Sequence, residues 1–240
     1  MKRQLCGALA GAALLAFVPL APSLAKDNDS RDEINVLKAE VTTLKAEVDR
    51  LKVRLSDTDD VLAVEKLQRI YGFYADKAQW DQVADLFAKD ATLEIAGRGV
   101  FVGQDHIRTY MHHLGALERG QLMNHMQLQP VVDIAPDGKT AKGRWQTLVQ
   151  LGQLGKTALI GAGIYENDYV KEGGVWKIKA LHYFNTYLTD FYKGWDKPGL
   201  PLAGPFADLP PDRPPSETYE AYPGVYVPPY HYANPVTGRK

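Results

Sequence analysis

The chain has 240 residues, of which 45% are hydrophobic and 24% are charged, so it is long enough for one sizeable hydrophobic core with additional segments. These proportions exclude a collagen-like, mucin-like or multi-span membrane protein. Lysine and arginine total 28 against 29 acidic residues, and the formal net charge of -1 gives no electrostatic reason to expect nucleic acid as a partner.

The first 25 residues have the pattern of an export signal. A basic start precedes an apolar run, and Ser23-Leu24-Ala25 follows as a small-x-small cleavage site. We expect the mature chain to begin near Lys26, to lack a membrane span, and to be periplasmic or secreted in a bacterium; an uncleaved membrane anchor is the alternative. Cys6 is the only cysteine and would leave with the signal, so we expect no disulfide and no cysteine chemistry.

Residues 31–60 are predicted to form a coiled coil. The first heptad position holds Ile34, Val41, Val48, Leu55 and Leu62, and the second holds Leu37, Leu44 and Leu51. In a parallel coiled coil, the charged residues that flank these heptad positions attract each other across the two chains. The pairs are Glu33 with Lys38, Glu40 with Lys45, and Glu47 with Lys52. This pattern predicts a homodimer or homotrimer, with Ile and Val before Leu favouring two strands. A lone amphipathic helix is the alternative.

Residues 61–195 are predicted to form the compact domain. A first helix leads into a short helix over residues 79–88, a strand over 91–95 and a helix over 103–114. Four long strands are expected at residues 122–134, 140–151, 157–170 and 175–188. Two hairpin turns are predicted, at Pro136-Asp137-Gly138 and at Glu172-Gly173-Gly174. This order predicts an α+β fold, a cone-shaped curved antiparallel sheet wrapped around helices.

Residues 196–240 form a Pro/Tyr-rich segment. It holds 11 of the 15 prolines, which excludes a regular helix or a central strand, so we expect extended chain. Its many tyrosines make it too apolar for a purely solvated tail. A tail packed over its own domain or its partner's is one interpretation, and a mobile tail is the other.

Several kinds of chemistry are excluded by what the domain lacks. Residues 61–195 contain no serine and no cysteine, so hydrolases with these nucleophiles are excluded. No glycine-rich phosphate-binding motif occurs, and we expect no nucleotide or other cofactor. His106, His112 and His113 share a helix, but they do not point to a common centre, so no metal site is expected.

Proton transfer by Asp, His and Tyr remains. Asp76 follows the end of the first helix, His125 begins the first long strand, and Tyr71 lies on the inner helix face. With Tyr165 these are the candidate catalytic residues. The candidate substrate-binding residues are Tyr74, Trp145, His182 and Tyr110. Each has a structural alternative: a core tyrosine, a helix-capping aspartate or a buried core histidine.

Two motifs carry a resemblance to a known family. The stretch from Tyr74 to Phe87 includes Asp76-Lys-Ala-Gln-Trp80-Asp81, and Gly103-Gln-Asp-His-Ile-Arg follows later. Together with the order of elements, they resemble the SnoaL-like branch of the nuclear-transport-factor-2-like superfamily over residues 61–192. The resemblance implies a cone formed by a curved sheet closed over helices.

Within that superfamily the nearest enzyme pattern is that of the scytalone dehydratases. Their acid falls on Asp76 and their strand histidine on His125, whereas a tyrosine beside the acid is Ala75 here. Tyr71 is similar to the helix tyrosine that holds the oxyanion in ketosteroid isomerases. The resemblance implies a cofactor-independent lyase that eliminates water or formaldehyde from a hydrophobic, lignin-derived or polyketide-like phenolic alcohol. A non-catalytic binding or scaffold protein for an apolar ligand and a ketosteroid-isomerase-type isomerase are the alternatives.

Overall fold

The computed structural model describes residues 23–240, so most of the expected export signal lies outside the described residues. The chain divides into two compact units, the first ending at Val53 and the second running from Arg54 to Lys240. Among the described helices, none has a stretch that is long and apolar enough to cross a membrane.

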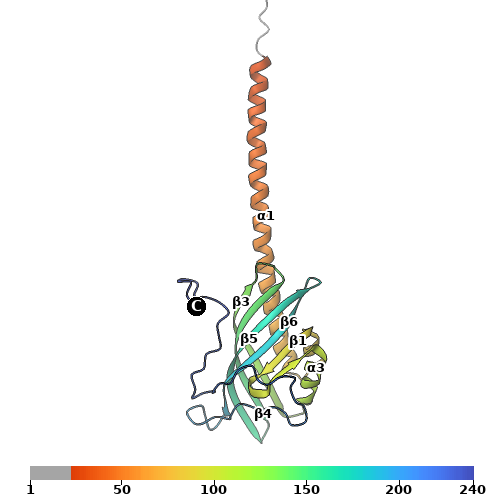
Figure 1. Ribbon diagram of the computed structural model, residues 1–240, viewed down its shortest axis with the longest axis vertical. Coiled ribbons are helices and arrows are strands. Elements are labelled where there is room, and N and C mark those ends of the chain that lie inside the picture. The colour runs from red at the N-terminus through yellow and green to blue at the C-terminus, as the bar shows by residue number, and fades with distance from the viewer. Residues whose placement is uncertain (1–22) are drawn as a thin grey trace, which may run out of the picture. The chain divides into compact units, whose positions relative to one another are not determined.

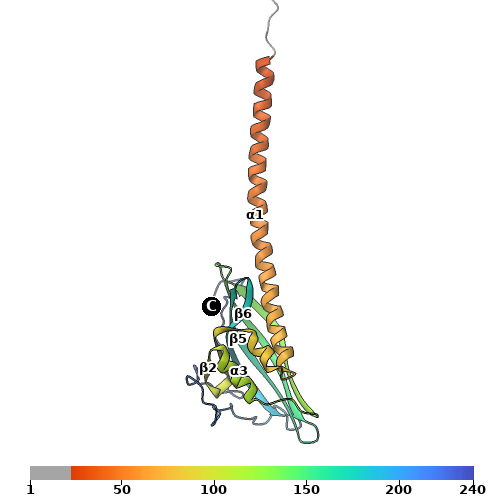
Figure 2. The same ribbon diagram turned by 90° about the vertical axis from the view of Figure 1, so that its right-hand side faces the viewer.

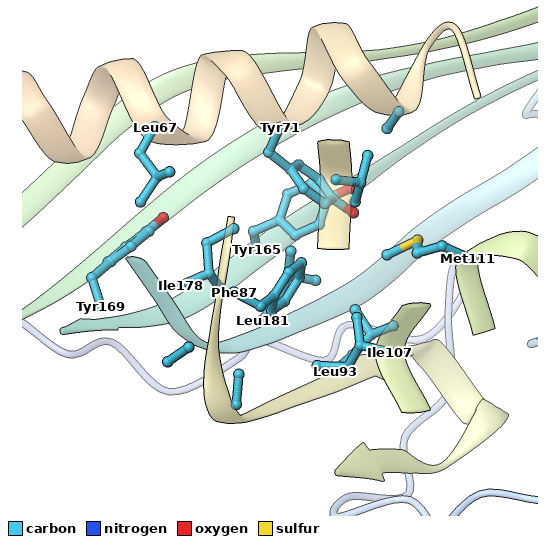
Figure 3. Close-up of a cluster of buried hydrophobic side chains, with 14 of the residues drawn as sticks. Leu67, Tyr71, Phe87, Leu93, Ile107, Met111, Tyr165, Tyr169, Ile178 and Leu181 are labelled. Atoms are coloured by element: carbon cyan, nitrogen blue, oxygen red, sulfur yellow. The ribbon is translucent and has the colours of Figure 1, made fainter. Parts of the chain in front are cut away.

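Helix α1 (Ser23–Ala75) contributes to both units. All residues from 29 to 59 are exposed to solvent. Within the second unit, side chains of α1 are buried from Asp60 onward, and Leu67 and Tyr71 point from the helix into the domain core (Figure 3).

One six-stranded sheet organises the second unit. Its strands are β1 (Phe87–Ile95), β2 (Val100–Val102), β3 (Gln121–Ile134), β4 (Thr140–Gln153), β5 (Thr157–Glu172) and β6 (Val175–Asp190), in the spatial order β2-β1-β6-β5-β4-β3. The four long strands β3 to β6 form the predicted antiparallel meander (Figures 1 and 2). The sheet is curved and does not close, which confirms the predicted α+β cone.

The region before the meander differs from the prediction in three ways. Helix α2 (Trp80–Asp85) ends early, because Phe87 and Ala88 already belong to β1 and are fully buried. Strand β2, joined to β1 by the short helix η1 (Ala96–Arg98), was not predicted, since three residues are too few to show a pattern. Strand β1 pairs in parallel with β6, because no hairpin fixes its direction.

The two predicted hairpin turns are present. Asp137 Oδ1 accepts hydrogen bonds from the backbone N–H groups of Lys139 and Thr140, at 2.8 and 3.0 Å, while Gly138 takes a positive φ of 62°. In the turn between β5 and β6, Gly173 and Gly174 have φ values of 57° and 83°, which only glycine adopts without strain. Local sequence therefore sets the lengths of these strands.

The helices share one face of the sheet and bury the main core against it. Helix α3 (Gln104–His113) contributes Ile107, Tyr110 and Met111, which are at most 2% exposed. These residues belong to the same buried cluster as Leu67 and Tyr71 of α1 (Figure 3). Burial of such large side chains stabilises each by about 1.5–3 kcal/mol.

The Pro/Tyr-rich tail, residues 196–240, contacts α3 through Phe206 and covers the opposite face of the sheet with its later residues. The backbone N–H of Asn185 donates to the Tyr219 hydroxyl at 2.8 Å, and Arg144 donates to the carbonyl oxygen of Pro228 at 3.2 Å. The tail has no regular helix or strand, as its prolines require, and it makes one isolated bridge to the sheet, between Arg213 and Val100. The structure therefore agrees with the first interpretation of the tail, because the tail packs over its own domain.

Candidate functional site

Asp76 and His125, which lie 49 positions apart in the sequence, meet where the end of α1 approaches the edge strand β3. The backbone N–H of His125 donates to Asp76 Oδ1 at 2.7 Å, and the imidazole Nδ1 lies 3.6 Å from the same oxygen. Gly72 allows this approach, because a Cβ there would lie 2.8 Å from Gln127 Cγ and 3.3 Å from the His125 carbonyl oxygen. The helix and the strand therefore bring a carboxylate and an imidazole together.

The His125 imidazole forms part of a wall between an inner cavity and an outer groove. The cavity has a volume of about 100 Å³ and is lined by Tyr71, Ala75, Trp80, Ile95, Tyr110, Met111, Leu114, Met123, His125, Tyr165 and Tyr183. The groove, about 280 Å³, is lined by residues of α1 and β3, including Arg69 and Phe73, and by Asp76, which follows α1. His125 Nδ1 is buried and has no hydrogen bond within the described structure. Because the His125 ring lines the cavity, it is placed to exchange a proton with a molecule bound there.

Four phenols surround the cavity. The rings of Tyr71 and Tyr165 meet edge to face at 6.1 Å, and those of Tyr165 and Tyr183 are tilted at 5.0 Å (Figure 3 shows the first pair). Burial raises the pKa of Tyr165 and that of Tyr110 to about 12, and it raises the pKa values of Tyr71 and Tyr183 well above 10. The phenols therefore stay neutral near pH 7 and remain hydrogen-bond donors.

Gln127, which is not among the predicted site residues, connects this site to the core. Gln127 Nε2 donates to the His125 carbonyl oxygen at 2.9 Å, and Gln127 Oε1 accepts from Gln68 Nε2 at 2.8 Å. Gln127 also stabilises the ionised form of Tyr165, which lowers the pKa of that phenol and partly offsets the effect of burial. Gln127 follows His125 by two positions in β3, so strict alternation predicts that both lie on one face of the strand.

Trp145 and Tyr74 are predicted to bind the substrate, but neither lines the cavity. Trp145 is fully buried, and its Nε1 donates to the Tyr169 hydroxyl at 2.9 Å in a polar network completed by Gln68 and Asn167. It is a core residue and does not line the cavity. Tyr74 is half-buried and packs against the edge of the core.

The prediction that His182 lines the same pocket is wrong. A β-bulge shifts the register between β5 and β6 at Asp168 and Tyr169, so the inward positions of β6 change from even to odd numbers after Ile178. His182 instead stacks on Phe184 at 3.8 Å, with its Nε2 3.6 Å from Glu94 Oε1. This is the sheet face covered by the tail.

A family model described as a SnoaL-like domain matches residues 56–182, more than half of the chain. The chain belongs to the SnoaL-like family. No curated protein matches the sequence significantly.

A solved structure with a TM-score above 0.5 agrees with this SnoaL-like assignment at the level of the fold. A candidate scytalone dehydratase from Novosphingobium aromaticivorans is 21% identical with a TM-score of 0.53, and the match covers 63% of this chain and 96% of that one. The type 3 hexachlorocyclohexane dehydrochlorinase LinA from Novosphingobium barchaimii is 20% identical with a TM-score of 0.49, over 60% and 94% of the two chains. The first similarity supports the nuclear-transport-factor-2-like cone.

The bulge that displaces His182 brings Tyr183 into the cavity of the SnoaL-like domain. The ring of Tyr183 lies directly over Gly163, where any side chain would collide with it. The sequence contains a sign of this arrangement, because the apolar positions of β6 pass from Trp176 and Ile178 to Leu181, an odd spacing that breaks strict alternation.

Within the described part of the SnoaL-like chain, no group of three or more His, Cys, Asp or Glu side chains is placed to hold a metal ion. The histidines of α3 are each engaged separately. His106 Nδ1 lies 2.6 Å from Asp212 of the tail, and His112 Nε2 lies 3.1 Å from Asp81 Oδ1 of α2. The site's polar groups are thus one carboxylate, one imidazole, phenols and an amide.

Proposed function

We propose that this protein is a cofactor-independent lyase that eliminates water or formaldehyde from a small, hydrophobic, phenolic alcohol by general acid-base catalysis. The observation that carries the proposal is the position of His125, with one nitrogen 3.6 Å from Asp76 and its ring in the wall of a cavity lined by phenols. An acid, an imidazole and hydrogen-bond donors around an apolar space are the components of such a site.

His125 is the proton-transfer group in this proposal. In a dehydration it would remove a proton from the carbon next to the carbinol carbon; the electron pair forms the double bond and the hydroxyl leaves as water with a proton from the imidazolium. In a loss of formaldehyde it would remove the proton of a hydroxymethyl group; the carbon-carbon bond breaks, its electron pair forms a double bond to the neighbouring benzylic carbon, and the hydroxyl on that carbon leaves as water with the proton from the imidazolium. The charge of Asp76 would stabilise the imidazolium formed in either reaction.

Tyr71 and Tyr165 would donate hydrogen bonds to the oxyanion that develops as the bond breaks. They suit this role because both are at most 5% exposed and because burial keeps the pKa of each far above 7. Tyr110 and Tyr183 complete the ring-lined wall, which would exclude water and position an aromatic ring by burial.

The volumes of the inner cavity and the outer groove are consistent with a small substrate. The inner cavity of about 100 Å³ suits a single small ring, and His125 separates it from the outer groove of about 280 Å³. A candidate scytalone dehydratase has the same fold, so the fold is compatible with a dehydratase. The assignment to this chain depends on the geometry of His125.

We also propose that the enzyme works outside the cytoplasm of a bacterium, after cleavage near Lys26. Support comes from the basic start, the apolar run and the Ser23-Leu24-Ala25 site. N-terminal sequencing of the protein recovered from a bacterial host tests this. A first residue near Lys26 in the exported fraction is expected, and a full-length chain retained in the cytoplasm contradicts it.

The activity is tested by incubating the purified protein with a panel of phenolic and non-phenolic aromatic alcohols and measuring alkene products and formaldehyde. We expect one of the two products from phenolic members of the panel. Tight binding of these alcohols with no product at any pH would favour the non-catalytic binding protein. Exchange of substrate hydrogens next to a carbonyl with deuterium oxide, without elimination, would favour the isomerase.

A further inference from the structure

The apolar seam of α1 is uncovered along its predicted length. Every residue from 29 to 59 is exposed, and the seam side chains retain 47% to 62% of their accessible surface: Ile34, Leu37, Val41, Leu44, Val48, Leu51 and Leu55. Most of the stability of a helix in a protein comes from packing of its apolar face, and an unpacked helix is marginal in water. We therefore expect the seam to bind a partner that covers its apolar side chains.

The width of the seam indicates what kind of partner fits it. Two positions per heptad are consistently large and apolar, whereas the neighbouring positions are mainly charged or small. A helix that packs on a globular core has a broader apolar face, and a stripe this narrow is the contact surface of a coiled coil.

The charges beside the seam fit a second copy of the same helix. The positions that precede the first seam position hold Glu33, Glu40, Glu47 and Arg54, and those that follow the second hold Lys38, Lys45, Lys52 and Asp59. In a parallel, in-register pair each residue of the first set meets the residue five positions later in the other chain. All four contacts are then attractive, including the one between Arg54 and Asp59, in which the signs are reversed.

The reversed pair disfavours other alignments. A parallel pair that slips by one heptad places Glu47 of one chain against Asp59 of the other and Arg54 against Lys52, which are like-charge contacts. An antiparallel pair in which Val41 faces Leu44 places Glu40 against Glu47 and Lys38 against Lys45 across the two chains. The sequence therefore favours one orientation and one register.

We infer that the exposed seam of α1 binds the seam of a second copy of this chain, as a parallel, in-register, two-stranded coiled coil. Ile and Val at the first seam position with Leu at the second favour two strands over three or four. This inference is independent of the proposed lyase activity, since none of the residues used in it belongs to the cavity.

Two double variants with identical chemistry test the surface. Val41 and Val48 lie in the seam and are 48% and 47% exposed, whereas Val36 and Val53 lie outside it and are 59% and 61% exposed. We expect sedimentation equilibrium to give twice the chain mass for the wild-type protein and for Val36→Asp/Val53→Asp. Val41→Asp/Val48→Asp should give the mass of one chain, because two charges would be buried in the seam.

Near-ultraviolet circular dichroism, which reports on the packing of the aromatic core, is the control that tests whether the domain is folded in every variant. A wild-type mass of one chain, or of three or more chains, overturns the inference. The same is true if the two double variants have equal masses.

Orientation and register are tested by a disulfide between copies. In a Cys6→Ser background, Leu37→Cys introduces the only thiol at a seam position, and Ala39→Cys is the control on the outer side of the helix. A parallel, in-register pair brings the two Leu37 positions within disulfide distance. We expect Leu37→Cys to form a linked dimer on mild oxidation and Ala39→Cys to remain mainly unlinked. Equal linking of both, or no linking of Leu37→Cys, overturns the proposed alignment.

Discussion

Two of the carboxylate-imidazole pairs in the domain have the same separation and different surroundings. Asp76 Oδ1 lies 3.6 Å from His125 Nδ1, and Glu94 Oε1 lies 3.6 Å from His182 Nε2. The side chains of both histidines are about equally exposed, at 23% and 19%. Distance and burial alone therefore do not distinguish a candidate catalytic pair from a structural one.

The neighbours of each pair make the difference. His125 adjoins the phenol-lined cavity, and its Nδ1 has no hydrogen bond among the described atoms. Glu94, by contrast, accepts hydrogen bonds from the backbone N–H and the hydroxyl of Ser216 at 2.8 and 2.6 Å, and His182 is stacked on Phe184. The first pair adjoins space for a ligand, and the second pair anchors the tail.

Removal of the imidazole from each pair is expected to give the largest difference in kcat between the two pairs. On an alcohol that the screen identifies as a substrate, we expect His125→Ala to lower kcat by about 10²- to 10⁴-fold, because the proton-transfer group is lost. His182→Ala should leave kcat within about twofold if the protein remains folded. Steady-state kinetics of both variants provide the measurement, and full turnover by His125→Ala would remove the proposed role.

Neutralisation of the carboxylate in each pair is expected to change kcat less than removal of the imidazole does. Asp76→Asn keeps an oxygen that can accept from the His125 backbone N–H but loses the charge beside the imidazole, so we expect kcat to fall about tenfold. Glu94→Gln is the matched control and should not change kcat. Equal kinetics for the two variants would show that the charge of Asp76 has no part in the reaction.

The same Glu94→Gln change should loosen the tail. Glu94 is 5% exposed and holds Ser216 through two hydrogen bonds, so loss of its charge should cost about 1–3 kcal/mol locally. Hydrogen exchange of residues 196–240 should accelerate in Glu94→Gln and stay unchanged in Asp76→Asn. Unchanged exchange in Glu94→Gln would mean that other contacts hold the tail.

The smallest expected effect is a pH dependence of stability from His182. Burial lowers the pKa of His182 below 6.5, against the opposing attraction of Glu94 and Glu166. The unfolded chain therefore takes up a proton at this residue as the pH falls below about 6.5, while the folded chain does not, and stability decreases. Urea unfolding at about pH 5.5 and 7.5 should show a smaller acid loss in His182→Gln than in the wild type. An equal acid loss in both proteins would contradict this assignment.

Much of the fold could be predicted from the sequence because its signals are local. Asp137-Gly138 and Gly173-Gly174 fix two hairpin turns, and the alternation between them gives the long strands. The resemblance to known enzymes placed Asp76 and His125 in one site. No local pattern in the sequence predicts that these two residues lie close together. Gly72 supplies the physical reason, since it lets α1 approach β3 closely.

The sequence by itself determined the helix seam, the meander, the proline-rich extended tail and the inward face of Tyr71. Only the tertiary structure decided that His182 faces the tail, that Tyr183 takes its place in the cavity and that Trp145 belongs to a buried polar network. The physical reason is that one extra residue at a β-bulge exchanges the two faces of a strand from that point onward. Where a bulge falls depends on how neighbouring strands pair, and that pairing joins residues distant in the sequence.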